Sequence, residues 1–379
     1  MTPPASQPND GRRRPPWLLP TPARHDEIGP EATVRTLLIR LMRGEDLPQA
    51  EAATLFGAAM DERATDAQIG AALVALAVKG ETVAELTGMA EAMRARAVRI
   101  HSHHERFIDT AGTGSSYAKT FNVSTAAAFA CAGAGVPVAK HGSRAATSLS
   151  GSADVLTELG VNIQVEAAIS ENCLNEIGIC FLFAPLYHQA TARVAHLRRQ
   201  LGVHTTFNLL GPLTNPAGAP RQLIGVWHES LLEPLAHTLL ALGTEHAWVV
   251  HGSDGLDEVT TTGLTKVAEA REGQVRIFEV GPADFDLPRC LSLEELRGGT
   301  PSENAQLIRA ILQNETGPRL EAARDLVLAN AAAAIVVGGR ETDLRAAAER
   351  ARDSLRSGAA FQKLEMLCRA TNVKSAAAS

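Results

Sequence analysis

Residues 107–125 read FIDTAGTGSSYAKTFNVST, and this stretch decides the class of fold. Phe107-Ile108-Asp109 is a short β-rich run, which the glycines of Gly112-Thr113-Gly114 bring to an end. Asn122-Val123-Ser124-Thr125 then offers an amide and two hydroxyls at the start of a helical pattern. A loop of this kind between a strand and a helix exposes backbone N–H groups to an anion. A plain tight turn is the alternative, because a Gly-x-Gly loop alone is weak evidence for a phosphate site.

Beyond this stretch, short β-rich runs alternate with helical stretches. Strands are expected at 136–139, 181–183, 223–226 and 247–250, and helices at 125–132, 153–159 and 231–242. Strands that alternate with helices are typical of a mainly parallel sheet covered by helices. The sequence therefore predicts an α/β fold for this part of the chain.

The region before residue 101 has a different pattern. From residue 31 to about residue 98, apolar residues recur at helical spacing, with breaks at 44–48 and 79–82. Thr65 followed by Asp66 is a helix start inside this region. The pattern predicts four consecutive helices and no strand.

The ends of the chain differ from the rest in composition. Eight of the 19 prolines fall within the first 30 residues, and proline can neither continue a helix nor donate to a sheet. We therefore expect a disordered tail at 1–26, a helical domain at 27–100, an α/β domain at 101–372 and a flexible C-terminus at 373–379. Helices near 187–205 are expected to join the helical domain. The arginine run at 12–14 is interpreted as part of a solvated arm.

Composition and charge exclude several classes of function. Lys and Arg number 36 against 42 Asp and Glu, so the formal net charge is −6, and aromatic residues make up 4% of the chain. Such a protein offers neither a basic field for a phosphate polymer nor stacking platforms for bases, so we expect no nucleic-acid partner.

Cysteine usage and hydropathy indicate the compartment. The five cysteines are widely spaced, with no CxxC pair, which fits a reducing environment. The sequence has neither the long apolar run of a membrane helix nor the short one of a secretory signal. We expect a cytoplasmic protein without a membrane partner.

A second group of candidate residues follows the expected strand at 136–139. Lys140-His141-Gly142-Ser143-Arg144 brings two permanent cations and an imidazole to the carboxyl edge of a parallel sheet, where α/β proteins bind ligands. Ser150-Gly151-Ser152-Ala153-Asp154 is another small-residue loop that opens a helix. Charged clusters also occur on plain surfaces, but two anion-binding helix starts with a lysine between them suggest a multiply phosphorylated ligand.

Three further segments carry charged or polar side chains. Asp257-Glu258 is either a solvated acidic turn or a pair of Mg²⁺ ligands, since Mg²⁺ takes few carboxylates plus substrate phosphates. Arg198 precedes FNLLGPLTNP at 207–216, where the many breakers predict a non-helical segment, and it could clamp a substrate carboxylate. The histidines at 101–104 are interpreted as part of a linker rather than a metal site.

The motifs together resemble the anthranilate phosphoribosyltransferase family: GTGS with NVST, KHGSR with SGSADVL, FNLLGPLTNP and DGLDE occur in its order and approximate spacing. The resemblance runs from about Glu31 to Asn372. It implies a small N-terminal helical domain, a larger α/β domain of the nucleoside phosphorylase and phosphoribosyltransferase-like fold, and a homodimer. It also implies transfer of the phosphoribosyl group from 5-phosphoribosyl 1-diphosphate (PRPP) to the amine of anthranilate. The products are N-(5-phosphoribosyl)anthranilate and pyrophosphate, the cofactor is Mg²⁺, and the pathway is tryptophan biosynthesis.

The resemblance also implies roles for individual residues. The implied PRPP-binding residues are Gly112, Thr113, Gly114, Ser115, Ser116, Thr120, Asn122, Val123, Ser124, Thr125, Lys140, Ser148 and Ser152. The implied anthranilate-binding residues are Gly112, His141, Ser143 and Arg198, and the implied metal contacts are Ser124, Asp257 and Glu258. No covalent nucleophile is implied, because stabilisation of the departing pyrophosphate is the main catalytic task.

Three departures from the family's pattern involve four positions. The usual GTGGD is GTGSS here, so Ser115 and Ser116 replace a glycine and an acidic residue. The usual KHGNR is KHGSR, which puts Ser143 in the place of an asparagine, and His204 stands where the family usually has an arginine. These departures bear on the identity of the acceptor and on the metal rather than on the fold.

Three alternative functions remain open at this point: a paralogue of the same fold with another aromatic acceptor, a pyrimidine-nucleoside phosphorylase, and a non-catalytic paralogue that binds nucleic acid. The Asp257-Glu258 pair and FNLLGPLTNP argue against the phosphorylase. The net charge of −6 argues against nucleic-acid binding.

Overall fold

The computed structural model describes residues 30–114, 120–145 and 149–373. The predicted tail at 1–26 and residues 374–379 of the predicted C-terminal segment lie outside these ranges.

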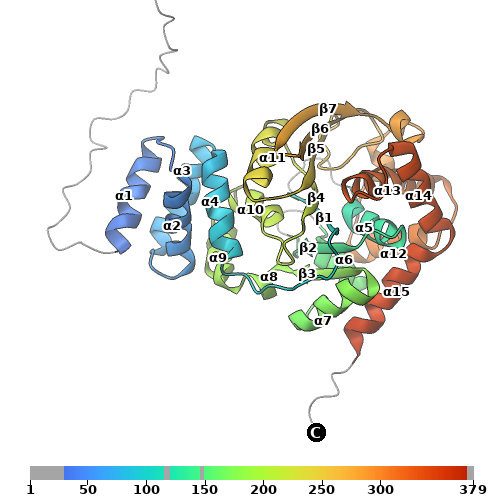
Figure 1. Cartoon of the computed structure of the whole chain (residues 1–379), viewed down its shortest axis with the longest axis horizontal. Coiled ribbons are helices and arrows are strands. Elements are labelled where there is room, and N and C mark those ends of the chain that lie inside the picture. The colour runs from blue at the N-terminus through green and yellow to red at the C-terminus, as the bar shows by residue number, and fades with distance from the viewer. Residues whose placement is uncertain (1–29, 115–119, 146–148, 374–379) are drawn as a thin grey trace, which may run out of the picture.

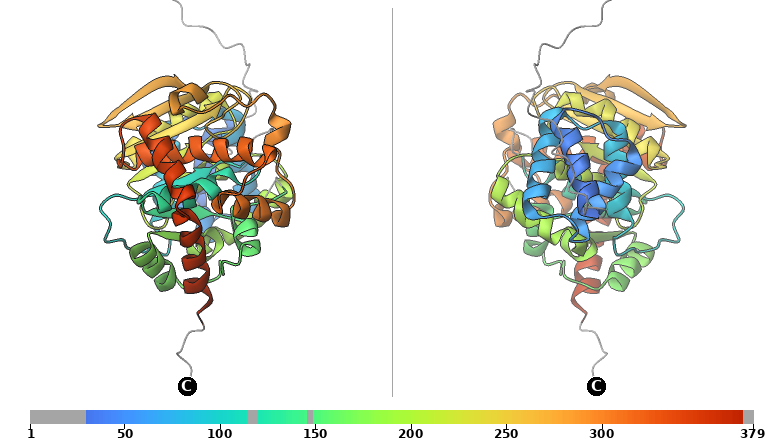
Figure 2. Two further views of the ribbon diagram at one scale, coloured as in Figure 1. Left: turned by 90° about the vertical axis from the view of Figure 1, so that its right-hand side faces the viewer. Right: turned by 90° about the vertical axis from the view of Figure 1, so that its left-hand side faces the viewer.

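Four consecutive helices open the described chain, as the apolar spacing predicts, and they group on one side of the molecule (Figures 1 and 2). Their bounds are Pro30–Met42 (α1), Gln49–Met60 (α2), Asp66–Lys79 (α3) and Val83–Arg94 (α4). The Thr65 side chain accepts a hydrogen bond from the Gln68 N–H while the Gln68 side chain accepts one from the Thr65 N–H, so a capping box starts α3. Thr82 and Glu85 start α4 in the same way.

One sheet dominates the remainder of the described chain. Its strands are Ile108–Gly112 (β1), Val138–Gly142 (β2), Ile179–Phe183 (β3), Arg221–Gly225 (β4), His246–Gly252 (β5), Thr265–Arg271 (β6) and Gln274–Val280 (β7). The order in the described sheet is β3-β2-β1-β4-β5-β6-β7; the first five strands are parallel and β6 and β7 are antiparallel. The predicted fold class, a small helical domain plus a larger domain with a mainly parallel sheet, is confirmed. The β6–β7 hairpin is an addition that the sequence analysis does not predict.

Helices and short turns connect the strands. The α-helices are Val123–Gly133 (α5), Ser152–Glu158 (α6), Ala167–Asn172 (α7), Ala184–Tyr187 (α8), Ala192–Leu201 (α9), Phe207–Leu213 (α10), Leu232–Ala241 (α11), Pro301–Leu312 (α12), Pro318–Val337 (α13), Leu344–Arg356 (α14) and Ala359–Asn372 (α15). A π-helix occupies Cys173–Ile177 (η1), and 3₁₀ turns occupy Gln189–Thr191 (η2), Glu229–Leu231 (η3), Pro282–Phe285 (η4) and Leu293–Leu296 (η5).

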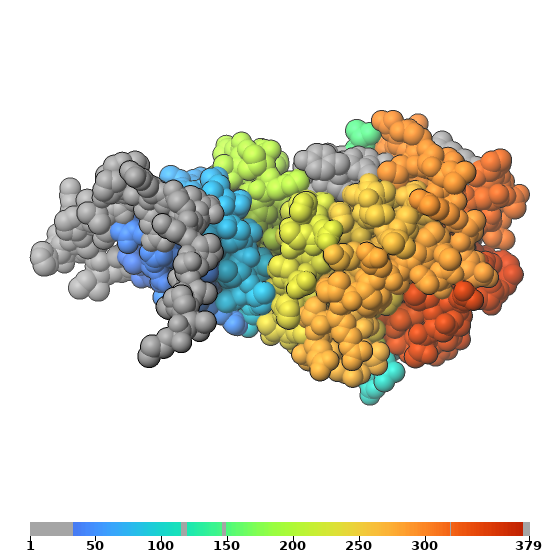
Figure 3. Space-filling model, turned by 90° about the horizontal axis from the view of Figure 1, so that it is seen from above, coloured from blue at the N-terminus to red at the C-terminus, as the bar shows by residue number. Residues whose placement is uncertain are grey.

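Strand alternation sends neighbouring side chains into two different hydrophobic cores. In β4, Leu223 packs in one core and Ile224 in the other, and in β5 Val250 and Val249 divide in the same way. The first core lies under α5 and α13, and the second continues through α10 and α11 into the helices α1–α4. The helical part therefore packs on one face of the sheet through α10 and α11, and the two parts lie side by side along the molecule (Figure 3).

The segment at 207–216 corrects one expectation, because Phe207–Leu213 forms α10 although Pro212 lies inside it. The helix is short, so Pro212 removes few helical hydrogen bonds. Its carbonyls find partners elsewhere: Gln222 Nε2 donates to the Pro212 carbonyl at 2.8 Å, and Arg94 Nε to that of Leu213 at 2.7 Å. These tertiary hydrogen bonds stabilise α10 although its sequence contains the helix-breaking residues Gly211 and Pro212.

The histidine-rich linker is tied to the α/β part by its neighbours. The His101 N–H donates to Glu171, the His103 N–H donates to Asn175, and the His104 ring contacts the Leu174 carbonyl. These partners lie at the end of α7 and in the π-helix η1. Across the residues that the structure describes, no group of three His, Cys, Asp or Glu side chains could hold a metal ion.

The order of the strands sets the place for a site. The chain adds β2 and β3 on one side of β1 and then returns to β4 on its other side. In open α/β sheets, ligands bind outside the carboxyl ends of the strands where the order reverses in this way. The ends of β1 and β4, at Gly112 and Gly225, form that position here.

Gly225 allows the loop after β5 to approach this position closely. A Cβ atom at Gly225 would lie 1.7 Å from the Asp257 carbonyl oxygen, so we expect Gly225→Ala to lower the free energy of unfolding by about 1 to 3 kcal/mol or more. The matched control is Gly70→Ala in α3, where a Cβ meets nothing within 4 Å and alanine favours the helix. Urea unfolding of both variants checks this, and wild-type stability of Gly225→Ala contradicts the close approach.

Candidate functional site

Lys140 connects the elements that meet at the reversal of strand order. It lies in β2 and is 4% exposed. Its Nζ donates to the Thr110 carbonyl of β1 at 2.5 Å and to the Ser124 hydroxyl of α5 at 3.2 Å. Burial lowers the pKa of Lys140, while the nearby Asp109 and Glu258 carboxyl groups oppose this shift. One ammonium group thus binds β1, β2 and the start of α5 together.

Asp257 and Glu258 approach the same place from the loop after β5. Asp257 Oδ2 accepts a hydrogen bond from the Gly114 N–H at 3.1 Å, and Glu258 lies beside the Ser124 backbone. Burial, and then the neighbouring Asp257, raise the pKa of Glu258 to about 8. A divalent cation relieves both effects, and two carboxylates with a hydroxyl suit Mg²⁺ that also binds phosphate oxygens. The donor set therefore fits a magnesium ion.

Two residues that sequence analysis missed hold this acidic loop in place. Asp254 accepts hydrogen bonds from the hydroxyls of Thr260 and Thr262 and, at 3.1 Å, from the Leu256 N–H. Buried Asn330 of α13 accepts from the Val259 N–H at 2.9 Å and donates to the Val259 carbonyl at 2.9 Å. Asp254 belongs to the DGLDE motif, so its position in sequence could have drawn attention to it. Asn330 lies 71 residues from Val259, and no local pattern indicates that contact.

The glycine loop after β1 lies against the acidic loop. The Thr113 N–H donates to the Gly225 carbonyl at 2.9 Å, which fixes the loop to the end of β4. A Cβ at Gly112 would lie 3.3 Å from Asp257 Oδ2, so the two loops are in contact. The loop residues Ser115 and Ser116, and Ser148 near α6, lie outside the described residues.

The predicted residues at the start of α5 differ in burial and in hydrogen bonding. Val123 and Thr125 are fully buried, and among the described residues the Thr125 hydroxyl has no hydrogen-bond partner. Thr120 forms an isolated antiparallel bridge with Arg297. Asn122 Nδ2 donates to the Ser150 carbonyl at 3.1 Å, which brings the second small-residue loop to the start of α5.

His141 and Ser143 lie at the end of β2. His141 is buried; its Nδ1 lies 3.2 Å from the Gly211 carbonyl of α10, and its ring centroid is 5.1 Å from that of His188. Burial, with His188 nearby, lowers the pKa of His141 to about 3, and burial lowers that of His188 to about 4, so both rings are neutral at pH 7. Ser143 is exposed, and its carbonyl accepts from Ser152 Oγ at 3.4 Å. Sequence analysis missed His188. This residue comes shortly after β3, and His141 lies near the end of the neighbouring strand β2.

Arg198 reaches the same helix as His141. Its Nη2 donates to Asn208 Oδ1 at 3.2 Å, and its guanidinium lies 5.2 Å from the centre of the Phe207 ring. Burial lowers the pKa of Arg198, but a guanidinium remains protonated in proteins. Asn208 and Gly211 are one helical turn apart in α10, so Arg198 and His141 contact neighbouring positions of this helix. Among the ion pairs of the described residues none involves Arg198, which leaves its charge available for a carboxylate.

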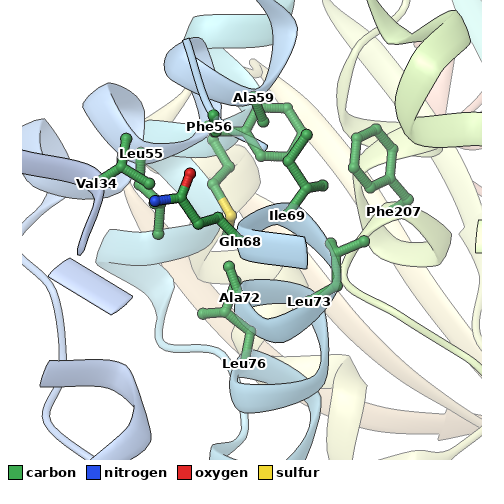
Figure 4. Close-up of a pocket in the computed structure, with 12 residues that line it drawn as sticks. Val34, Leu55, Phe56, Ala59, Gln68, Ile69, Ala72, Leu73, Leu76 and Phe207 are labelled. Atoms are coloured by element: carbon green, nitrogen blue, oxygen red, sulfur yellow. The ribbon is translucent and has the colours of Figure 1, made fainter. Parts of the chain in front are cut away.

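An apolar pocket in the helical part is separate from this site (Figure 4). Side chains of α1, α2, α3 and α4 line it together with Phe207. Most of these side chains belong to the buried core of that part, so the pocket is a packing feature. Within the ranges that the structure describes, no helix has the length and apolar composition to span a membrane.

Two family models match the chain. "Glycosyl transferase family, a/b domain" covers residues 104–361, and "Glycosyl transferase family, helical bundle domain" covers residues 35–97. The chain is 49% identical to the anthranilate phosphoribosyltransferase of Anaeromyxobacter sp. (strain K) over 340 residues, which are 90% of this chain and 99% of that protein. It is 51% identical to that of Rhodospirillum rubrum over 331 residues, 87% of this chain and 94% of the relative.

Solved structures agree with the sequence relatives. The crystal structure of anthranilate phosphoribosyltransferase from Thermus thermophilus superposes with a TM-score of 0.83 at 38% identity, covering 90% of this chain and 99% of that one. The Saccharomyces cerevisiae enzyme in complex with PRPP and Mg superposes with a TM-score of 0.82 at 24% identity, covering 91% and 99%. At this lower identity the second likeness concerns the fold alone.

The acidic pair gives a prediction about metal dependence. We expect Asp257→Asn and Glu258→Gln each to raise the Mg²⁺ concentration needed for half-maximal turnover by about tenfold or more, because each removes a charged metal ligand. The measurement is the rate of pyrophosphate release over a Mg²⁺ titration. The control is Glu272→Gln, which removes one negative charge from an exposed residue in the β6–β7 turn. This variant should match wild type. Unchanged Mg²⁺ dependence in both site variants removes the metal assignment.

Proposed function

The chain belongs to the glycosyl transferase family of the anthranilate phosphoribosyltransferases, and from this premise we propose that it transfers the phosphoribosyl group of PRPP to the amine of anthranilate. The products are N-(5-phosphoribosyl)anthranilate and pyrophosphate, in tryptophan biosynthesis. One observation carries the proposal: Lys140, the glycine loop, the start of α5 and the Asp257-Glu258 pair meet at the reversal of strand order.

We assign the PRPP side of the site to the residues around this meeting point. Ser124 contributes a hydroxyl and Lys140 a positive charge, and the glycine loop, whose Gly114 N–H is bonded to Asp257, lies beside them. These groups favour the oxygens of a diphosphate. Mg²⁺ held by Ser124, Asp257 and Glu258 would neutralise charge on the leaving pyrophosphate. The remaining proposed residues are Gly112, Thr113, Gly114, Thr120, Asn122, Val123, Thr125 and Ser152 in the described ranges, and Ser115, Ser116 and Ser148 outside them.

The acceptor side is assigned to Arg198, His141, Ser143 and Gly112. The guanidinium of Arg198 suits the carboxylate of anthranilate, and the neutral His141 ring gives the aromatic acceptor an uncharged wall. An aryl amine attacks while neutral, so the protein need not supply a covalent nucleophile. Most of the changing charge is on the pyrophosphate, and electrostatic stabilisation of that group is the main contribution of the residues around Lys140.

The alternatives receive less support. The relatives with about half of their residues identical over nearly their whole length are anthranilate phosphoribosyltransferases rather than phosphorylases or nucleic-acid-binding paralogues. The alternative of a paralogue with another aromatic acceptor is tested directly by the assay below.

The proposal extends to the organisation of the protein. We propose a helical domain at 27–100, joined by helices near 187–205, and an α/β domain at 101–372; contacts of α9 with α2 and α3 support this division.

We also propose a homodimer. Its support is the exposure of Val74 and Val78, 42% and 77%, which lie one turn apart on α3. The cytoplasm is the proposed compartment, and the support is the absence of CxxC pairs among the five cysteines.

Pyrophosphate release tests the function directly. With PRPP and Mg²⁺, the protein should release pyrophosphate when anthranilate is present and far less when it is absent. Ring-substituted aminobenzoates serve as competing acceptors, and thymidine with phosphate serves as the phosphorylase control. A clear preference for a substituted ring, or phosphorolysis of thymidine, overturns the proposed reaction.

Arg198 gives a more specific test of the acceptor side. We expect Arg198→Ala to raise the KM for anthranilate by about tenfold to a hundredfold, because a lost charge-assisted bond to a carboxylate costs about 1.5 to 3 kcal/mol. The KM for PRPP should change much less. Arg199→Ala, at the exposed next position of α9, is the matched control. Equal effects of Arg198→Ala on both substrates count against a carboxylate clamp.

A further inference from the structure

The N-cap residue of α5 does not cap its own helix. Asn122 occupies this position, and among the described residues its side chain forms no hydrogen bond to the first turn. An asparagine at an N-cap normally accepts a hydrogen bond from the N–H of the second or third helical residue. In α5 these residues are Ser124 and Thr125. Something must therefore hold the Asn122 side chain in a different direction.

Three hydrogen bonds hold Asn122 away from its helix. Its Oδ1 accepts from Ser150 Oγ at 3.0 Å and from Asn304 Nδ2 at 3.1 Å, and its Nδ2 donates to the Ser150 carbonyl at 3.1 Å. Ser150 belongs to the loop before α6, and Asn304 belongs to the first turn of α12, 182 residues along the chain. The side chain of Asn122 thus links the start of α5 and the Ser150 loop to a distant helix.

The hydrogen bonds of the Asn304 side-chain amide allow only one orientation of that amide. It is 3% exposed, and its Oδ1 accepts a hydrogen bond from the Gly299 N–H at 2.8 Å. Since a backbone N–H can only donate, the amide NH₂ of Asn304 must point to Asn122. At the other end the Ser150 carbonyl can only accept. The direction of every hydrogen bond from Gly299 to Ser150 is therefore determined by the two backbone groups.

The segment before α12 is packed so that Asn304 stays in this place. A Cβ at Gly298 would lie 2.4 Å from the Thr120 carbonyl oxygen, so the segment touches the residues just before Asn122. Thr300 and Glu303 form a capping box that fixes the first turn of α12. The geometry positions an amide donor on the side of Asn122 that faces away from α5.

The position of Asn122 has a consequence for the site. The Ser124 N–H, which a capping asparagine could take, is left to the neighbouring Glu258 carboxylate. If Asn122 rotated to the usual capping position, it would compete with Glu258 for this donor and release the Ser150 loop. Both changes would alter the region in which the proposed function places PRPP.

We propose that Asn304 is a positioning residue for PRPP binding: through Asn122 it keeps the start of α5 uncapped and the Ser150 loop attached to it. The proposal rests on the proposed function, since it concerns the PRPP side of the same site. Asn304 acts through Asn122 and need not touch the substrate.

The experiment uses the full chain with Asn304→Ser and Asn304→Asp. The aspartate variant keeps the bond from Gly299 but has no N–H for Asn122, so an acceptor faces an acceptor. Both variants should raise the KM for PRPP and its calorimetric dissociation constant by about fivefold to tenfold at saturating Mg²⁺. The KM for anthranilate at saturating PRPP should remain within about twofold of wild type.

A double-mutant cycle separates positioning from general destabilisation. Asn122→Ala alone should weaken PRPP binding, and adding Asn304→Ser should weaken it little further, because the second residue acts through the first. Ile308→Val, one turn further along α12 and fully buried, is the control: it lowers the melting temperature without changing PRPP binding.

The outcomes distinguish failure of the proposed function from failure of the positioning role of Asn304. Wild-type protein that neither binds PRPP nor releases pyrophosphate refutes the proposed function. If wild type binds PRPP, additive effects in the cycle, equal rises in both KM values, or unchanged PRPP binding in the Asn304 variants refute the positioning role. Failure of both Asn304 variants to fold where Ile308→Val folds also refutes it, because the residue is then structural.

Discussion

The buried ammonium of Lys140 is the interaction on which the site depends. Burying a cation is unfavourable unless hydrogen bonds and opposite charges compensate it. Here the Thr110 carbonyl and the Ser124 hydroxyl accept its hydrogen bonds, and Asp109 and Glu258 supply negative charge. Burial raises the pKa of Asp109 to about 6, so this carboxylate in turn needs the cation. The end of β1, the end of β2 and the start of α5 are thereby held in one polar cluster inside an apolar surrounding.

Helix α10 connects this cluster to the rest of the molecule. Its carbonyls accept hydrogen bonds from Arg94 of α4 and Gln222 of β4, and the Gly211 carbonyl lies beside the His141 ring. The same helix packs in the core shared by the helical part and one face of the sheet. The helical part therefore contacts, through α10, the His141 and Arg198 side chains, which lie on the proposed acceptor side.

Local features of this site could be predicted from sequence, whereas its long-range contacts could not. The glycine loop, the start of α5 and the Lys140 strand each have a local pattern, since a strand, a turn residue and a helix start lie within a few residues of one another. Asn304 and Asn330 contact residues 182 and 71 positions away, and a buried amide looks like any polar residue in a helical pattern. α10 was wrongly expected to be irregular for the same reason, because the hydrogen bonds that satisfy its carbonyls come from distant segments.

At Ser143, one of the departures from the family pattern, the backbone carbonyl rather than the side chain forms the structural hydrogen bonds. At Ser143 the carbonyl accepts from the Ala153 N–H at 3.2 Å and from Ser152 Oγ, and any residue can supply that carbonyl. The side chain is exposed, so replacing asparagine by serine changes a side chain on the proposed acceptor side and keeps the backbone hydrogen bonds to α6. His204 is likewise exposed, and its ring lies 5.1 Å from that of Trp227. The attachment of α6 at Ser143 can thus stay constant while the side chain on the proposed acceptor side varies, because the two depend on different atoms of the same residue.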